Sequence, residues 1–360
     1  MAKRLTYLIL LPFILLTTAV AQIEPPKLTP VPSTESQKQR IRAGVALHDQ
    51  GDYSAAIAKY EDVLKENPTN VLALYELAFT LSAKKEYRKS LEMAYKGAQY
   101  QSESLTDFYL LIGNNLDLMG EPKKSVEIYK KALTLKPDDH LLHYNLAVTY
   151  NNMGNPEEAK KSLKEATFAN PNHPSSHLLL GTIWYKTRYR TPALFAVSRF
   201  LIIEPRSQRS PNAFNVLQEI LKGGVSEGQK PNQINIAVDF AASKDEGDFG
   251  TVDLVLGLSR AAGMTEKDKS KSEVQLFVDQ LETVLAIMSE TDPKGDKTKF
   301  TWRYYIPYFV EMKKNNYVEP FAYYISQTSR FAGVKQWLAD NGTRLNEFLS
   351  WSKNYQWAKE

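Results

Sequence analysis

The feature that most constrains the fold is a pattern of residues that recurs along the chain about every 34 residues. The first copy runs from Gly44 through Gly51 and Tyr60 to Pro68. A weaker copy without the closing proline runs from Ala78 to Ala98. Stronger copies follow at Gly113 to Pro137, Ala147 to Pro171 and Gly181 to Pro205. Such a period indicates that one small structural unit is repeated and stacked.

The residue types predict what each unit is. Apolar residues at helical spacing predict two amphipathic helices, and small residues at equivalent positions let these helices pack closely. The small residues are Gly44, Ala78, Gly113, Ala147 and Gly181 in the first helix, and Ala56, Ser90, Ser125, Ala159 and Ala193 in the second. Glycines such as Gly51 suit the turn between the helices, and prolines such as Pro68 end the second helix. No unit can cover its own apolar face, so the units must stack.

A 34-residue period with these residues resembles the tetratricopeptide repeat. Five copies are expected, at 37–70, 71–104, 106–139, 140–173 and 174–207. The resemblance implies an all-α fold, a right-handed superhelical α-solenoid with a concave groove, followed by a mainly helical C-terminal domain over 208–360. It also implies a protein–protein interaction scaffold with no enzymatic activity and no cofactor, which binds a protein or peptide in the groove.

In that family, ligand contacts come from the fifth, ninth, twelfth and thirteenth positions of each first helix. The resemblance therefore implies a partner-binding groove made by Ile41, Val45, His48, Asp49, Tyr75, Phe79, Ser82, Leu110, Asn114, Asp117, Leu118, Tyr144, Val148, Asn151, Asn152, Leu178, Thr182, Tyr185 and Lys186. An alternative is that the C-terminal segment packs on some of these faces. A carboxylate clamp is not expected, because Leu110 stands where the family would need a lysine.

The first residues predict an export signal. Lys3 and Arg4 precede a short apolar run, and Ala19-Val20-Ala21 offers a cleavage site before Gln22. The run is shorter than the ~20 residues that span a bilayer, although an uncleaved anchor is the alternative. The chain has no cysteine, which excludes disulfides and a lipid anchor on cysteine and suits an oxidising compartment. We therefore expect a periplasmic protein with signal peptide 1–21 and a proline-rich linker at 22–36.

Composition argues against other functions. The 45 basic and 41 acidic residues leave a net charge of only +4, without the cation cluster that nucleic-acid binding needs. The histidines His140, His143, His173 and His177 are spaced for a metal, but their positions in the repeat favour packing. The acidic residues Asp245, Glu246, Asp248 and Asp253 are predicted to form a loop without calcium-binding spacing.

The C-terminal region leaves two alternatives open. An aromatic tract could form a stacking platform for cell-envelope glycans or a buried core, and helical spacing favours the core. The tract comprises Trp302, Tyr304, Tyr305, Tyr308, Phe309, Tyr317, Phe321, Tyr323 and Tyr324. A hydrolase site made by carboxylates distant in sequence is the other alternative.

Local signals predict helices in most of this region. Ser210-Pro211 and a capping box at Ser270 and Glu273 predict two helix starts, and further apolar stripes follow Pro320 and Phe331. The segments 234–240 and 252–258 alternate in polarity, and neighbouring alanines favour helix for both.

Overall fold

A computed structural model of the chain describes residues 25–227, 229, 234–236, 246–265, 271–291 and 298–359. The backbone divides into two compact units, residues 1–137 and 138–360. The fourth and fifth sequence repeats therefore belong to the same compact unit as the C-terminal region. The predicted boundary at 207 separates the repeats from the sequence without repeats, whereas the boundary between the compact units lies between Pro137 and Asp138.

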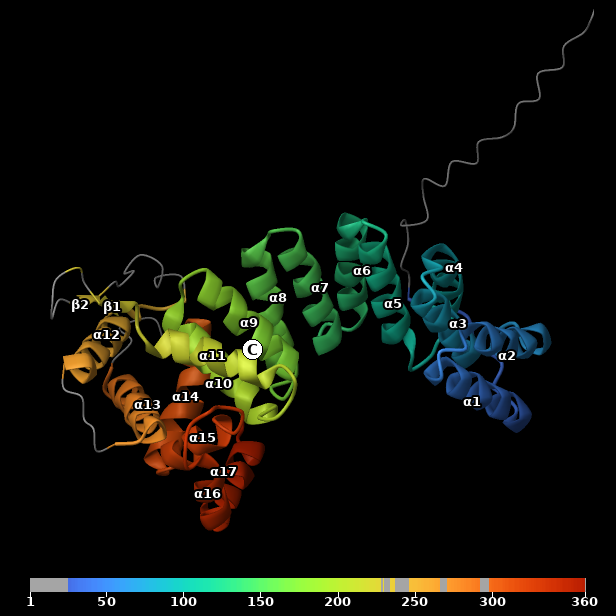
Figure 1. Ribbon diagram of the computed structural model, residues 1–360. Helices are drawn as coiled ribbons and strands as arrows, with labels where there is room; N and C mark the ends of the chain where they lie inside the picture. Colours follow the sequence, from blue (N-terminus) through green and yellow to red (C-terminus); the bar gives the residue numbers. More distant parts are fainter. Residues whose placement is uncertain are drawn as a thin grey trace, which may run out of the picture. The chain divides into compact units, whose positions relative to one another are not determined.

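Unit 1 consists of three helical pairs (Figure 1). Its helices are α1 (Glu35–Asp49), α2 (Tyr53–Glu66), α3 (Val71–Ala83), α4 (Tyr87–Gly97), α5 (Leu105–Leu118) and α6 (Pro122–Leu135). Polar side chains start several of them. Thr34 and Gln37 form a capping box at α1, and the carboxylate of Asp52 accepts from the amide of Ala55 at α2. These bonds satisfy amides that a helix start leaves without partners.

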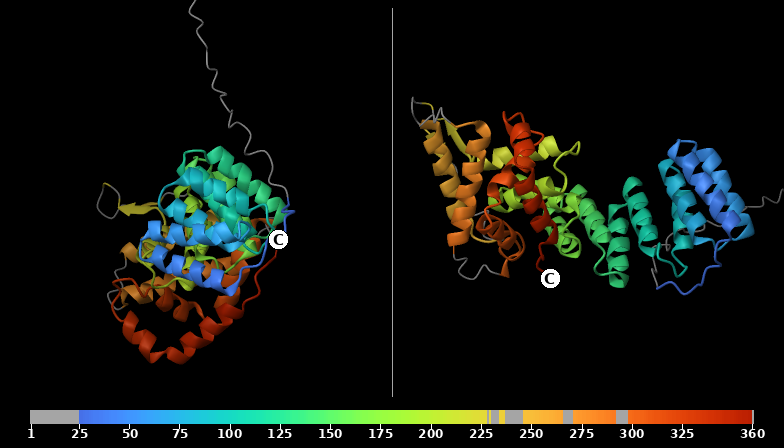
Figure 2. Two further views of the ribbon diagram at one scale, coloured as in Figure 1. Left: turned by 90° about the vertical axis from the view of Figure 1, so that its right-hand side faces the viewer. Right: turned by 90° about the horizontal axis from the view of Figure 1, so that it is seen from below.

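Unit 2 begins with two further pairs and continues into other helices (Figures 1 and 2). The pairs are α7 (His140–Asn152) with α8 (Pro156–Ala169), and α9 (Pro174–Lys186) with α10 (Arg190–Ile203). After them come α11 (Ser210–Leu221), β1 (Val225–Glu227), β2 (Ile234–Ile236), α12 (Gly250–Thr265), α13 (Glu273–Glu290), α14 (Phe300–Lys314), α15 (Val318–Ile325), α16 (Val334–Asp340) and α17 (Gly342–Asn354). The fold is the predicted all-α arrangement of helical pairs, with one short hairpin added.

Two local predictions in unit 2 are wrong. Residues 234–236 form β2, which pairs antiparallel with β1, so the helix predicted at 234–240 does not form there. Alternating isoleucines suit a strand, and the alanines that favoured helix lie outside the described residues. The capping box of α13 is formed by Ser272 and Gln275, not by Ser270 and Glu273. The helix predicted at 252–258 is confirmed as part of α12.

The two helices of a repeat approach closely where a glycine faces a tyrosine. A β-carbon on Gly113 would lie 2.3 Å from the Tyr129 ring, and one on Gly44 would lie 2.4 Å from the Tyr60 ring. Both tyrosines are completely buried. In the fourth repeat the equivalent residues are Ala147 and Leu163, which are also completely buried. In these repeats a small residue in the first helix therefore packs against a large residue in the second helix.

The turn inside each repeat has left-handed backbone geometry. The three glycines there have φ between 76° and 82°, whereas Lys85 has φ 66° and Arg188 has φ 68° at the equivalent positions. An added β-carbon at Gly120 would meet no atom within 4 Å. The requirement for glycine is thus conformational, and the second and fifth repeats bear strain that the other repeats avoid.

The described part of the proline-rich segment packs on the helices of unit 1. The amide of Leu28 donates to the carbonyl of Gln99 over 3.2 Å, and its carbonyl accepts from the amide of Gln101 over 2.8 Å. Further along, Asn67 Nδ2 donates to the carbonyl of Val31 over 3.1 Å. Residues 28–31 therefore lie against the loops that follow α2 and α4, unlike a free spacer.

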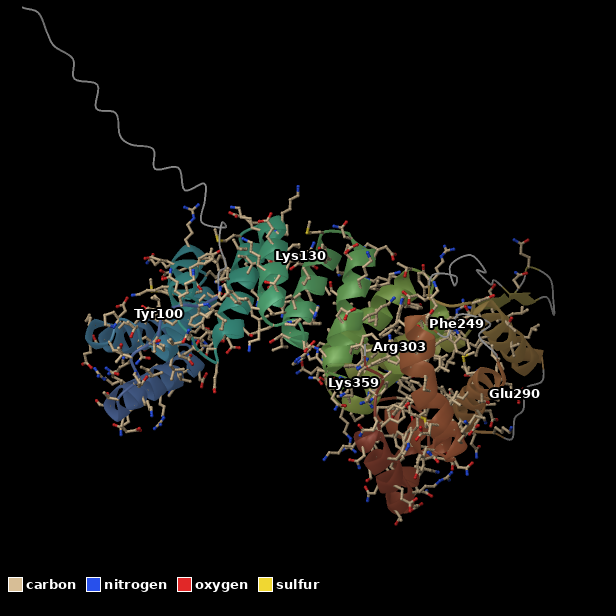
Figure 3. The ribbon with its side chains drawn as sticks, turned by 180° about the vertical axis from the view of Figure 1, so that it is seen from behind. Tyr100, Lys130, Phe249, Glu290, Arg303 and Lys359 are labelled. Atoms are coloured by element: carbon tan, nitrogen blue, oxygen red, sulfur yellow. The ribbon has the colours of Figure 1, made fainter. Side chains whose placement is uncertain are left out.

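Helix α10 is the centre of unit 2. Twelve of its residues are buried, from Thr191 to Ile202. Helices α9, α11, α12, α14 and α15 all contact it. Aromatic side chains of α14 fill the space beside it; Phe195 and Phe309 lie 4.9 Å apart between ring centroids. The end of the chain is held there too, because Arg303 donates to the backbone carbonyl of Lys359 (Figure 3).

The glycine–tyrosine pairing predicts a strong coupling between two substitutions. Gly113→Ala should lower the free energy of unfolding by about 1–3 kcal/mol, because the new methyl group overlaps the Tyr129 ring. Tyr129→Leu should remove that overlap, although it costs a buried ring and its hydrogen bond to Asn114. Calorimetry of the four proteins in the cycle should show a favourable coupling of about 1 kcal/mol or more. Additive effects would contradict the pairing.

The turn geometry predicts opposite signs for two exchanges. Gly120→Ala should destabilise the chain by about 1 kcal/mol, because alanine must adopt a left-handed backbone. Lys85→Gly should stabilise it by roughly 0.5 kcal/mol, since relief of strain exceeds the extra entropy of the unfolded chain. Urea unfolding of both variants measures the difference; the same sign for both would refute the strain at Lys85.

Candidate functional site

The first helices of unit 1 present one face, which we call the inner face. The first helices of neighbouring repeats contact one another, α1 with α3 and α3 with α5. The second helices of neighbouring repeats are further apart, so the side made by the first helices is the concave one. Four of its predicted binding residues are exposed, namely Asp49, Phe79, Asn114 and Leu118. The half-buried ones are Val45, His48, Tyr75, Ser82, Leu110 and Asp117. Leu118, at the end of α5, is 61% exposed.

A row of stacked rings runs along this face. The ring of Phe79 lies 5.1 Å from that of His48 and 6.1 Å from that of Tyr75, nearly parallel to both. His48 is oriented by a 2.8 Å hydrogen bond between its Nδ1 and Thr80 Oγ1. Tyr75 packs edge-on against Phe108 of α5 at 5.6 Å. We call His48, Tyr75 and Phe79 the aromatic row.

Phe79 is the least covered member of the row. It is 42% exposed, although stacking on two neighbours fixes its position. A large aromatic side chain that is both exposed and held rigid can bury the side chain of a partner at little entropic cost. The aromatic row therefore has the physical properties of a binding surface.

One predicted site residue is misplaced. Ile41 is only 2% exposed and belongs to the core of the first repeat with Tyr60, Val63 and Leu77. It cannot reach a ligand on the inner face, because α3 packs over it. The family's binding position does not apply to Ile41, because burying a large aliphatic side chain between helices stabilises the fold.

Ser82 also serves the structure itself. Its hydroxyl donates to Asn115 Oδ1 over 2.5 Å, and Asn115 Nδ2 donates to Ser90 Oγ over 2.7 Å. Ser90 Oγ in turn donates to the carbonyl of Ala78 over 2.6 Å. Asn115 is buried, and this chain of bonds joins α3, α4 and α5. No sequence signal marked Asn115, because its role depends on partners in the preceding repeat.

Unit 2 has its own inner face on α7 and α9. Its predicted residues Tyr144, Val148, Leu178 and Thr182 are half-buried, and Asn151, Asn152, Tyr185 and Lys186 are exposed. Tyr144 packs edge-on against His173, with ring centroids 5.0 Å apart. None of these eight residues is buried by the C-terminal helices, which instead contact α10 and the residues around it.

The histidines of unit 2 take structural roles. His177 is completely buried; its Nδ1 lies 2.7 Å from Tyr305 Oη, and its Nε2 lies 3.0 Å from the carbonyl of Pro171. Both ring nitrogens are therefore engaged. The rings of His140 and His173 meet edge-on at 5.1 Å. Among the described residues, no three histidines or acids are grouped as metal ligands would be.

The aromatic tract of the C-terminal region is mostly core, so the proposed glycan platform is wrong. Tyr304, Tyr305 and Tyr308 are at most 1% exposed, and Trp302, Phe309, Phe321 and Tyr323 are also buried. The hydroxyl of Tyr304 donates to the carbonyl of Thr167 over 2.8 Å, which joins α14 to α8. Rings packed in this way offer no open platform on which a sugar could stack.

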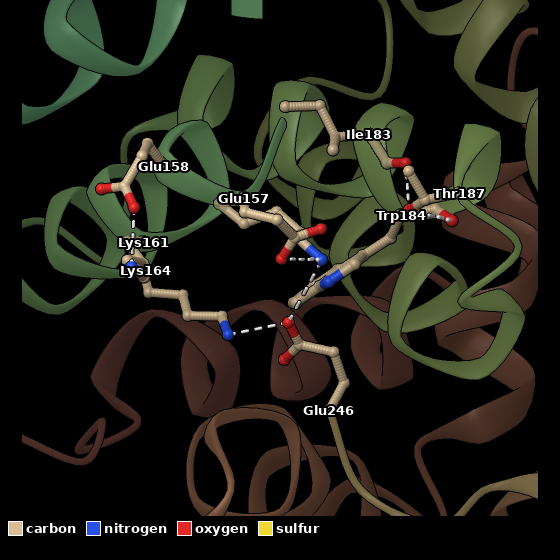
Figure 4. A network of polar contacts seen from close by, with 9 residues as sticks. Glu157, Glu158, Lys161, Lys164, Ile183, Trp184, Thr187 and Glu246 are labelled. Atoms are coloured by element: carbon tan, nitrogen blue, oxygen red, sulfur yellow. Dashed lines mark hydrogen bonds and ion pairs between the residues drawn. The ribbon is translucent and has the colours of Figure 1, made fainter. Parts of the chain in front are cut away.

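The acidic stretch before α12 is likewise part of the structure. Glu246 is buried; one of its carboxylate oxygens lies 2.8 Å from Lys164 Nζ and 4.0 Å from Lys160 Nζ (Figure 4). Asp253 lies inside α12, contrary to the predicted loop, and accepts from the Thr191 hydroxyl over 2.7 Å. Burial raises the pKa of Asp253 to about 6. Asp245 lies outside the described residues.

Whether the chain could span a membrane depends on its first residues and on the length and polarity of its helices. Residues 1–24, which carry the predicted export signal, lie outside the described residues. In the rest of the chain that the structure describes, every helix is too short or too polar to cross a bilayer.

Comparison with known sequences identifies the repeats. A tetratricopeptide repeat family model matches residues 47–94 and 118–183. The general transcriptional corepressor trfA of Dictyostelium discoideum is 25% identical over 124 residues, which are 34% of this chain and 9% of that protein. The BBSome complex member BBS4 of Bos taurus is 25% identical over 133 residues, or 37% of this chain and 25% of that protein. The similarity thus spans a quarter or less of these relatives.

Solved structures include similar repeat proteins. The thermophilic tetratricopeptide repeat protein TTC0263 of Thermus thermophilus is 22% identical and superposes with a TM-score of 0.41. The match covers 51% of this chain and 98% of that protein.

The buried histidine predicts a pH-dependent stability. Burial, and next to it the charge of Arg199, lowers the pKa of His177 to about 3. The unfolded chain therefore takes up a proton near pH 6.5 while the folded chain does not, so stability is complete above that pH and falls as the pH drops towards 3. Between about pH 7 and about pH 5, the burial of His177 should lower the free energy of unfolding by about 2 kcal/mol.

Thermal unfolding at several pH values measures this loss. His177→Gln, whose amide can bond both partners, should flatten the acid-side decline, whereas His48→Gln in unit 1 should leave it unchanged. An equally steep decline in His177→Gln would show that other groups cause it.

Proposed function

We propose, from the tetratricopeptide repeats matched at residues 47–94 and 118–183, that the chain is a non-enzymatic scaffold that binds a protein or peptide. The partner binds on the inner face of unit 1. The observation that carries this proposal is the aromatic row, in which Phe79 is exposed between His48 and Tyr75. Burial of one such ring by a partner gives a few kcal/mol, enough to anchor a segment.

The surroundings of the row suit an extended segment or a helix. Asn114 and Asp117 on α5 and Asp49 on α1 provide amide and carboxylate groups on the inner helices, and such groups can bond the backbone or side chains of a ligand. Leu118 adds an exposed apolar side chain on α5. An apolar centre with polar groups at its edge is the usual composition of a protein-binding surface.

Unit 2 supplies a second, separate contact surface in this proposal. Tyr144 and Tyr185 are accessible on α7 and α9, and the C-terminal helices leave them so. Helices α12, α14 and α15 support this surface indirectly, because they pack on α10 of the fifth repeat.

The periplasm is the compartment we propose. Support comes from the sequence, namely the basic and apolar start, the Ala19-Val20-Ala21 site and the lack of cysteine. An uncleaved anchor would instead leave the protein attached to the membrane, so fractionation distinguishes the two.

Substitution on the inner face tests the binding proposal. Cross-linking in living cells followed by mass spectrometry identifies the partners of the tagged protein. Tyr75→Ala, Phe79→Ala and Tyr144→Ala together should lower recovery of the specific partner at least about tenfold, which corresponds to a loss of about 1.4 kcal/mol. These side chains are not fully buried, so melting should change little.

Leu258→Ala is the matched control, because Leu258 is 51% exposed and lies on α12. It should leave recovery unchanged. Equal recovery with the triple variant and the control would place the binding surface elsewhere.

Cell fractionation and N-terminal sequencing test the compartment. The mature protein should begin at Gln22 and appear in the periplasmic fraction. Ala19→Arg and Ala21→Arg should block cleavage, because the signal peptidase needs small residues at these two positions of its site. A cytoplasmic protein that retains Met1 would refute this part.

A further inference from the structure

Charge is distributed unequally between the two helices of the second and third repeats; in the first repeat, α1 carries three cations and two carboxylates and α2 carries two cations and three carboxylates. On the inner side, α3 carries only Glu76 and α5 carries only Asp107 and Asp117, without any lysine or arginine. The second helices α4 and α6 are rich in cations, namely Arg88, Lys89, Lys96, Lys123, Lys124, Lys130 and Lys131. The inner face is therefore negative although the whole chain is slightly positive.

The cations of α1 do not neutralise this face. Arg40 forms a bidentate pair with Glu66 of α2, and Lys38 and Arg42 approach Glu35 at 3.8 Å and 3.5 Å. Arg40 is thus matched by Glu66, whereas Lys38 and Arg42 share the single carboxylate of Glu35. In the part of the chain that the structure describes, Asp49 and Glu76 have no cation within ion-pair distance.

These two carboxylates are sequence neighbours of members of the aromatic row. Asp49 follows His48 in the chain, and Glu76 follows Tyr75. Glu76 is half-buried, and its pKa is raised first by burial and then by the negative charge of Asp49. The ionised pair is therefore unfavourable in the free protein, and an added positive charge would relieve it.

We propose that the inner face of unit 1 selects a cationic segment, in which a lysine or arginine lies beside an aromatic or large aliphatic residue. The apolar side chain packs on Phe79, and the cation lies between Asp49 and Glu76. This inference rests on the proposed binding function and specifies its partner. It adds a sign of charge that the repeat fold by itself does not impose.

Several effects favour such a segment over a neutral or acidic one. A cation compensates the two like charges of Asp49 and Glu76. An acidic segment would add a third negative charge and be repelled. Binding should consequently weaken as salt rises, because the carboxylates are only partly shielded from solvent.

Selection from a displayed library of random peptides, each about 12 residues long, tests the inference without knowledge of the natural partner. The full mature chain is immobilised at neutral pH and low salt. Peptides selected by the wild type should contain aromatic or large aliphatic residues with adjacent Lys or Arg, enriched about threefold or more over the input. The best peptide, made synthetically, should bind about 5- to 10-fold more weakly to Asp49→Asn/Glu76→Gln, since both charges that attract the cation are removed.

Two other variants separate the contributions. Phe79→Ala should lose the enrichment of apolar residues. Glu92→Gln/Glu127→Gln removes two exposed carboxylates from α4 and α6 in the same unit and should bind as the wild type does. Circular dichroism confirms that each variant is folded.

The outcomes distinguish the two proposals. Selection of apolar peptides that need Phe79 but contain no excess of cations, or contain acids, would overturn the cationic preference and leave the binding function intact. Selection that yields no apolar preference, with Phe79→Ala equal to the wild type, would overturn the binding function itself.

Discussion

The architecture depends on how closely the two helices of one repeat can approach. Where Gly44 or Gly113 faces a tyrosine, the ring occupies the space that a side chain would need. The second helix then lies flat against the first, and the buried tyrosine of the first repeat also packs towards the next one. Because the apolar face of each pair remains incomplete, the next pair must cover it, and stacking follows from this deficit.

Unit 2 completes the last pair in a different manner. A sixth repeat would ordinarily cover the apolar side of α10, but here α11, α12, α14 and α15 surround it. The aromatic residues of α14 supply large buried areas, and their hydroxyls bond to backbone and side-chain groups of the repeats. Arg199 lies in the same region against the stacked rings of Tyr308 and Trp357, 5.4 Å and 4.8 Å from their centroids. The density of aromatic residues in the C-terminal sequence is thus explained by packing.

Different residues hold the helices together and form the accessible binding surface. Small and aliphatic residues, with Asn115 between neighbouring repeats, hold the helices in place. The aromatic row lies on this support and is itself fixed by stacking, so little entropy is lost when a partner binds. The lysines on α4 and α6 keep the opposite side hydrated, and the inner face retains the acids. A division of this kind gives one face affinity and the other solubility.

Sequence by itself determined the repeat period, the helical pairs, most helix starts and the positions where small residues are needed, because these depend on local spacing and on backbone geometry. It also placed most of the inner-face residues on accessible surface. Tertiary structure decided that Ile41 is core, that the aromatic tract of α14 is buried, and that Glu246 is paired with Lys164. It also decided that the fourth and fifth repeats join the C-terminal helices in one compact unit. Periodicity states which side of a helix is apolar, but only the packed chain shows which neighbour covers that side and which polar groups meet there.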